Sequence, residues 1–257
     1  MDLLIKGSTE LNKMFAALQN TAAGLRRDFG EIEDLQQSLK SAKDFVAKAS
    51  ARIEESILSD LQLVRPSAGL LTPDVSKSGD GRDEFVLALS GAANFVRGNS
   101  HFAISLALRS NGETKIALVY SPIEERLYYA ESGNGAYVFS AYHSEKVRVS
   151  NLKEPVDLTI GYNTNGIRPI IAGSARETGC PALDLAWVAS GKMDGFISDP
   201  IDYAESDSGA YVFSAYHSEK IRVSNLKEPT DLTIGYNTNG IRPMIAGNAR
   251  ETGCVYF

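Results

Sequence analysis

The chain carries one stretch of its sequence twice. Residues 129–180 recur as residues 203–254, at an offset of 74 positions, and the copies differ at only six of 52 aligned positions. The differing pairs are Gly133/Asp207, Asn134/Ser208, Val147/Ile221, Val156/Thr230, Ile170/Met244 and Ser174/Asn248. Repeat folds normally share a motif over three or more units, so two nearly identical copies indicate a recent tandem duplication. Because two copies cannot fill one place in a globular fold, one copy must be displaced, exchanged with another chain or used differently.

The composition is that of a globular protein without strong attraction for polyanions. The 257 residues are 43% hydrophobic and 23% charged, and the net charge is −6. This length suffices for one large domain or two small ones. Clustered Lys and Arg side chains dominate binding to nucleic acids and anionic membranes, so we expect neither as a partner.

Neither a targeting segment nor a membrane span is evident from the sequence. The first ten residues contain too short an apolar run for a signal peptide, and no segment approaches 18 consecutive apolar residues. We therefore expect a cytoplasmic protein. Cys180 and Cys254 are the same position in the two copies, so only one cysteine is independent. A free thiol is the expected state in a reducing cytoplasm, and a Cys180–Cys254 bridge is the alternative.

Two long helices are predicted before residue 66. Apolar residues at i, i+3, i+4 and i+7 predict one helix over Thr9–Asp28, which ends near Gly30. A similar apolar pattern predicts a second helix over Lys43–Val64, which Pro66 terminates. Frequent Ala, Leu, Glu and Lys residues favour helix throughout this region.

Short apolar or alternating runs replace the helical pattern after residue 66. Turn signals such as Asn111-Gly112 separate the runs, which predicts an antiparallel meander. The predicted strands are Phe85–Leu89, Phe102–Leu108, Thr114–Tyr120, Arg126–Ala130, Ala136–Phe139, Lys146–Val149 and Leu158–Tyr162. A further helix is predicted over Pro181–Gly191, with Pro near its start and Gly at its end. This order of elements predicts a layered α+β fold of the αβαβα type.

Several segments, in order along the chain, resemble the motifs of one enzyme family. Gly91–Phe95 (GAANF) resembles the end of a D-P-L-D-G-T-T-N-F motif, and Glu177–Phe196 resembles a G-S-A-A-L-D-L-A-x-V-A-x-G-x-x-D-G-F motif. Ala42–Val46 and Arg65–Ser67 match two further segments. Over roughly residues 8–200 the chain resembles the inositol monophosphatase family, which are Mg²⁺-dependent, Li⁺-sensitive sugar-phosphate phosphatases. The resemblance implies a five-layer αβαβα fold, an inositol phosphate or sugar phosphate as substrate, and Mg²⁺ as cofactor.

The chain departs from this family at the positions that bind the metal ions. Metal-assisted attack of water on a phosphate monoester needs oxygen ligands around two or three Mg²⁺ ions. The resemblance implies a Glu-Glu pair, two Asp in the D-P-L-D motif and an Asp in a later W-D motif. This chain has Pro73 and Asp74 at the first motif, and Leu87 and Ser90 at the two Asp positions of the second.

Two more departures concern the attacking water and the last metal ligand. Ala92 stands where the family has a Thr that aligns the attacking water, and Asp202 follows Ile201 where the W-D motif is expected. Asp74 and Asp202 are therefore the residual candidates for metal ligands. We expect them not to hold even one Mg²⁺ tightly, because this ion requires near-ideal octahedral coordination.

The candidate phosphate-binding positions lie in two places. Gly179 and Cys180 match the family's substrate-contacting pair at the start of a helix, and Gly91 and Ala92 follow the second motif. A helix N-terminus attracts anions, so Gly179 and Cys180 either bind phosphate or form a plain helix cap.

The duplication alters the expected organisation of the chain. We expect residues 1–130 to form the N-terminal helices and an antiparallel sheet, and residues 131–202 to begin a second α/β half. Residues 203–257, which contain the second copy, replace the family's C-terminal segment. Only residues 163–166 separate the strand near 158–162 from one expected near 167–172, so a family helix is missing there and a tight turn is expected.

Three functional hypotheses follow. The leading one is a catalytically impaired pseudo-phosphatase of inositol-phosphate or sugar-phosphate hydrolase ancestry. The second is an active Mg²⁺-dependent phosphatase with substitute ligands, for which Asp74, Asp199, Asp202 and Glu205 are the candidates. The third is a non-catalytic binding or assembly protein, such as a homodimer in which the extra copy pairs between chains.

Overall fold

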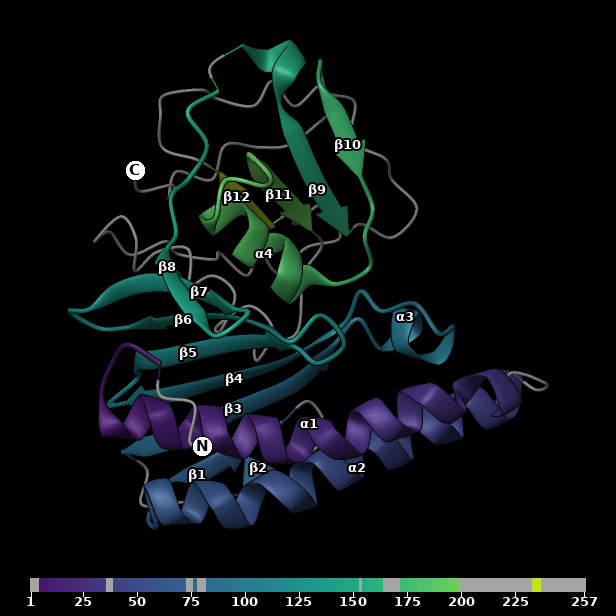
Figure 1. Cartoon of the computed structure of the whole chain (residues 1–257), viewed down its shortest axis with the longest axis vertical. Coiled ribbons are helices and arrows are strands. Elements are labelled where there is room, and N and C mark those ends of the chain that lie inside the picture. The colour runs from purple at the N-terminus through teal and green to yellow at the C-terminus, as the bar shows by residue number, and fades with distance from the viewer. Residues whose placement is uncertain are drawn as a thin grey trace.

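The helices and strands form successive layers in this computed structural model (Figure 1). The structure describes residues 5–35, 39–72, 76–77, 82–152, 154–163, 172–198 and 233–236. A helix pair covers one face of an eight-stranded sheet, and helix α4 lies between this sheet and a second sheet of four strands. None of the described helices has an apolar segment long enough to cross a membrane.

The helix pair consists of α1 (Thr9–Leu35) and α2 (Leu39–Val64). The predicted end of α1 near Gly30 is wrong, because the helix continues for five residues beyond it. A glycine inside a helix costs only about 1 kcal/mol relative to alanine, which is too little to stop a long helix. Helix α2 ends where predicted, and Arg65 just beyond it binds Glu10 of α1 and Asp83 of the first sheet.

The first sheet contains the predicted antiparallel meander. The strands pair in the order β2-β1-β3-β4-β5-β6-β7-β8. Their bounds are Gly69–Leu71 (β1), Ser76–Lys77 (β2), Asp83–Ser90 (β3), Ala103–Ser110 (β4), Glu113–Ser121 (β5), Arg126–Glu131 (β6), Gly135–Ser140 (β7) and His143–Lys146 (β8). The two short strands β1 and β2 were not predicted, and β1 runs parallel to β3.

The last strand of this sheet begins earlier than predicted. Ala141 and Tyr142 both have positive φ angles, of 47° and 65°. A two-residue turn of this kind joins adjacent antiparallel strands directly, so β8 begins at His143 instead of Lys146. The first sheet therefore continues to Lys146, beyond the division expected at residue 131.

Both faces of the first sheet are buried. Phe15 of α1 and Ile57 of α2 belong to a core that contains Leu106 and Tyr129 of the sheet. Small side chains on the opposite face let helix α4 (Pro181–Ala189) approach the sheet closely, and they are Ala103, Ala117, Ala130 and Ala136. Burial on both faces explains why the strands are nearly continuous apolar runs.

The second sheet brings together strands from both copies of the duplicated segment. Its order is β10-β9-β11-β12, with β9 (Thr159–Asn163), β10 (Ser174–Arg176), β11 (Gly195–Ser198) and β12 (Thr233–Tyr236). Strand β9 is parallel to both of its neighbours, whereas β12 is antiparallel to β11. The remaining elements are a short helix α3 (Ala92–Val96) and a 3₁₀ helix over Pro155–Asp157. Residues 164–166 of the tight turn predicted at 163–166 lie outside the described residues, as do residues 203–232 and 237–257.

Candidate active site

A sharp turn after β3 begins the candidate site. Gly91 has a φ angle of 81°, and a Cβ atom added there would lie 2.9 Å from the carbonyl oxygen of His101. Only glycine combines this left-handed conformation with such a close backbone approach. The turn places the partly exposed Ala92 at the start of α3, next to the buried Ser90 at the end of β3.

The structure joins the end of β3 to the beginning of α4. The Ser90 hydroxyl accepts a hydrogen bond from the backbone N–H of Ala182 at 3.2 Å. The buried sulfur of Cys180 lies 3.4 Å from the same hydroxyl oxygen. The predicted positions Ser90, Gly91 and Cys180 are therefore brought together from residues about 90 positions apart in the sequence.

Asn94 links the two halves of this site, a role that the sequence analysis did not assign. Its amide nitrogen donates hydrogen bonds of 2.8 Å to the carbonyl oxygens of His101 and Thr178. Gly179 has a φ angle of 76°, and a Cβ atom there would lie 3.2 Å from the same nitrogen. Asn94 thereby holds the turn before α4 against the turn after β3. The sequence feature that could have indicated this role is the position of Asn94 in the GAANF segment.

The side chains present do not suit Mg²⁺ at the positions the structure describes. Leu87 is 1% exposed and packs in the core under α1 and α2. Ser90 is fully buried, and its oxygen already accepts the Ala182 N–H. Ala92 has no side-chain oxygen. Among the described ranges, no group of three His, Cys, Asp or Glu residues is arranged to hold a metal ion. Pro73, Asp74 and Asp202 lie outside the described residues.

A buried carboxyl group that the sequence analysis did not single out supports the turn before α4. Asp184 is fully buried, and the Thr178 hydroxyl donates a hydrogen bond of 2.7 Å to it. Thr178 in turn accepts the backbone N–H of Cys180 at 3.2 Å. Burial raises the pKa of Asp184 to about 7, although the Thr178 hydrogen bond opposes this shift. An Asp inside the apolar run PALDLAWVA was the signal in the sequence.

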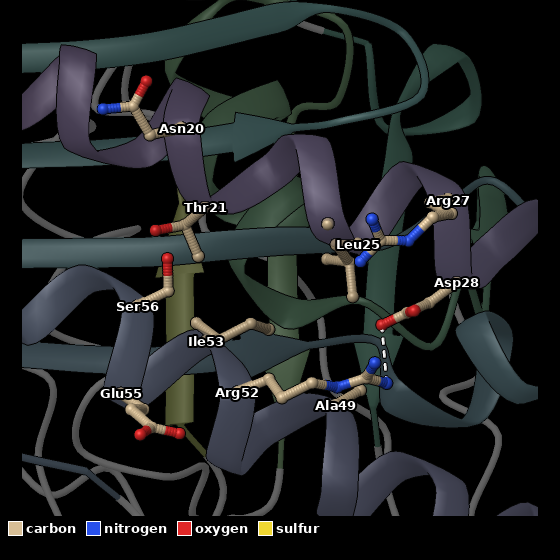
Figure 2. Close-up of a pocket in the computed structure, with 11 residues that line it drawn as sticks. Asn20, Thr21, Leu25, Arg27, Asp28, Ala49, Arg52, Ile53, Glu55 and Ser56 are labelled. Atoms are coloured by element: carbon tan, nitrogen blue, oxygen red, sulfur yellow. Dashed lines mark ion pairs between the residues drawn. The ribbon is translucent and has the colours of Figure 1, made fainter.

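A separate groove lies between α1 and α2 (Figure 2). Its volume is about 410 Å³, and Thr21, Arg27, Asp28, Arg52 and Ser56 are among the polar residues that line it. Arg52 pairs with Asp28 at 2.7 Å across the groove. The groove belongs to the helix layer, apart from the β3–α4 junction that assembles the candidate site.

A helix pair on one mixed sheet, with α4 between that sheet and a second mixed sheet, defines a layered α+β fold. Comparison with known proteins assigns the chain within this class. Residues 8–211 match the Inositol monophosphatase family, so the chain belongs to that family.

Individual relatives agree with this assignment. An inositol-1-monophosphatase of Rhizobium meliloti is 36% identical over 206 residues, which cover 74% of this chain and 76% of the relative. A protein named Nus factor SuhB from Escherichia coli K12 is 28% identical over 77% of this chain and 80% of its own length. The crystal structure of extragenic suppressor protein suhB from Bartonella henselae matches with a TM-score of 0.71 at 28% identity, over 81% of this chain and 85% of that chain. The predicted family and fold class are both confirmed.

Proposed function

We propose that this protein is a catalytically impaired member of the inositol monophosphatase family. The observation that carries the proposal is the chemistry at the family's ligand positions. A leucine packed in the core stands at one position, and a serine whose oxygen is already hydrogen-bonded stands at another. Phosphoryl transfer depends almost wholly on positioning and charge neutralisation, so loss of the metal ligands removes nearly all of the rate enhancement.

The start of α4 supports the same conclusion for phosphate binding. An anion at a helix N-terminus is held by free backbone N–H groups. Here the N–H of Cys180 is donated to Thr178 and that of Ala182 to Ser90. Pro181, between them, has no N–H. Gly179 and Cys180 are therefore proposed to form a plain helix cap with little affinity for phosphate.

A phosphate-release assay tests the proposal directly. Inositol-1-phosphate with millimolar Mg²⁺ is the substrate condition, an active family enzyme is the positive control, and Li⁺ is the inhibitor. We expect no Mg²⁺-dependent release above the buffer rate. Li⁺-sensitive turnover would overturn the proposal and favour an active enzyme with substitute ligands from Asp74, Asp199, Asp202 and Glu205. Titration calorimetry with Mg²⁺ alone tests the metal site separately from substrate binding.

Restoring the family residues separates the metal site from the altered C-terminus. One variant restores the family's oxygen-bearing residues at these positions. It combines Pro73→Glu, Leu87→Asp, Ser90→Asp and Ala92→Thr. We expect it to remain inactive in the same assay, because residues 203–257 still replace the segment that completes the family's site. Measurable Li⁺-sensitive activity in this variant would show that the C-terminal replacement is harmless.

A second candidate function is assembly with another copy of the chain. The second copy supplies strand β12 beside β11. An identical strand from a second chain would fit the same position. Light scattering over a wide concentration range tests this candidate. A monomer at every concentration would contradict it.

A further inference from the structure

Three buried polar atoms gather on one side of α4 without hydrogen-bond partners among the described residues. They are the Nε2 atom of His101, the Oδ2 atom of Asp184 and the Nε1 atom of Trp187. The rings of His101 and Trp187 are 4.8 Å apart, and His101 Nε2 lies 4.0 Å from Asp184 Oδ1. An unsatisfied buried polar atom costs about 1–3 kcal/mol, so three in one contact group require an explanation.

This group connects directly to the turn before α4. Asp184 accepts the Thr178 hydroxyl, and Thr178 accepts the Cys180 N–H, so the carboxyl group orients both residues. The Thr178 carbonyl is held in addition by Asn94. The protonation state of Asp184 therefore acts on the conformation of residues 178–180.

The charged surroundings favour one proton on this pair. Desolvation lowers the pKa of His101, and the more distant Glu124 only partly opposes it. Desolvation raises the pKa of Asp184 to about 7. Lys192 lies over Trp187, with its Nζ 5.6 Å from the ring centroid, and this Nζ donates to the Tyr128 hydroxyl. No charge adjacent to Asp184 among the described residues compensates an ionised carboxylate, apart from a protonated His101.

We propose that Asp184 and His101 are paired positioning residues for the Thr178–Cys180 turn, with one proton on the Asp184 carboxyl beside a neutral His101 imidazole. In this state Oδ1, which lies 4.0 Å from His101 Nε2, accepts the Thr178 hydroxyl, and the proton is on Oδ2. The inference rests on the proposed function only in taking this turn as the former substrate-side wall. The experiments below use no substrate, so a positive phosphatase assay would leave the inference standing.

The pair makes closure of the turn insensitive to pH. When the turn opens, Asp184 regains an ordinary carboxyl pKa and releases its proton, while His101 regains an ordinary imidazole pKa and takes one up. At pH values between the lowered pKa of His101 in the closed state and the ordinary imidazole pKa of about 6.5, these changes cancel, because the open and closed states hold the same number of protons.

Single substitutions at the two residues should make opening of the turn depend on pH, in opposite directions. In His101→Gln only Asp184 remains, so opening of the turn releases a proton. The equilibrium constant for opening therefore rises about tenfold per pH unit as the pH increases from 4.5 to 6.5. In Asp184→Asn only His101 remains, so opening of the turn takes up a proton. The equilibrium constant for opening therefore rises as the pH falls, by up to about tenfold per pH unit. In the wild type the equilibrium constant for opening should change by less than about threefold over the same pH range. His143→Gln, at a histidine that is 74% exposed in β8, is the matched control and should behave as the wild type.

Amide hydrogen exchange measures this opening. The protection factor of the Cys180 amide reports the turn, because its N–H is donated to Thr178. The Ala182 amide, which is donated to Ser90, is the internal control and should keep a flat pH profile in all variants. Equal slopes at both amides would place the effect on the whole fold and overturn the positioning role. Slopes of the same sign in the two variants would also overturn it.

A spectroscopic measurement on the wild type tests the proposal even if one of the variants does not fold. Side-chain ¹⁵N shifts should show a neutral His101 at pH 6, and the ¹³C shift of the Asp184 carboxyl should show the protonated form. A charged imidazole beside an ionised carboxylate at that pH would contradict the proposal. Trp187, the single tryptophan, offers a fluorescence reporter in contact with His101.

Discussion

The two copies of the duplicated segment place the same four residues in different structural roles. Thr-Ile-Gly-Tyr begins β9 (Thr159–Asn163) and forms β12 (Thr233–Tyr236), on opposite sides of β11 (Figure 1). Strand β9 is interior and parallel to β11, whereas β12 pairs only with β11 among the described strands and is antiparallel. A strand sequence therefore determines that a segment extends, while the connections determine its direction. Helix α4 provides the crossover that parallel β9 and β11 require.

The six differences between the copies fall unevenly on the fold. Gly133 has a φ angle of 83° in the β6–β7 turn, and the Asn134 amide donates to the buried carboxylate of Glu131. The second copy has Asp207 and Ser208 at these positions. The first copy is thus better suited to the hairpin of the large sheet. The other described differences, at Val147, Val156 and Ser174, change no backbone requirement.

The largest expected effect comes from the shared glycine of β9 and β12. A Cβ atom at Gly161 would lie 2.9 Å from Met193 Sδ and 3.2 Å from a ring carbon of Phe196. We expect Gly161→Ala to lower the free energy of unfolding by about 2 kcal/mol through overpacking. Gly235→Ala, the same change in the second copy, should cost less, because β12 pairs with a single neighbour among the described strands. Urea unfolding measures both.

This pair of variants tests whether the copies really differ in role. Equal losses would mean that the second copy occupies a site as tightly packed as the first. A larger loss for Gly235→Ala would reverse the assignment of interior and edge strands.

A smaller effect should follow when the first turn is given the sequence of the second copy. Gly133→Asp places a side chain at positive φ, and Asn134→Ser removes a hydrogen bond to Glu131. We expect the double variant to lose about 1–2 kcal/mol of unfolding free energy. The reverse pair, Asp207→Gly with Ser208→Asn, is the matched comparison in the second copy. A stable double variant would show that the turn does not decide which copy forms the hairpin.

The sequence was sufficient for the elements with regular apolar spacing. Helices α1, α2 and α4 and strands β3–β7 all correspond to predicted segments. Strand β8 was misplaced because Val147 and Val149 follow a strand-like alternation, yet Val147 packs toward α4 after the strand has ended. A three-residue strand such as β1 carries too little pattern to be recognised, since its pairing with β3 depends on distant residues.

Motif order predicts the residue types at the candidate site, and that part stays a prediction, whereas the hydrogen bonds among these residues could not be predicted from the sequence. Motif order placed Leu87, Ser90 and Gly91 at the end of one strand. The contact of Ser90 with Ala182, and that of His101 with Asp184, join residues more than 80 positions apart, so only the folded chain reveals them. The same holds for the loss of free N–H groups at the start of α4.

The smallest expected effect comes from Val147→Ile, another exchange of the first copy for the second. Val147 is 3% exposed and packs in the core beside α4, so one added methylene must be accommodated among Ala136 and its neighbours. We expect the unfolding free energy to decrease by less than about 1 kcal/mol, because this core is already filled. Val156→Thr, at a side chain that is 68% exposed, is the matched control and should stay within about 0.5 kcal/mol of the wild type. A loss above 2 kcal/mol for Val147→Ile would mean that the second copy is excluded from the first copy's place by its packing as well as by its turn.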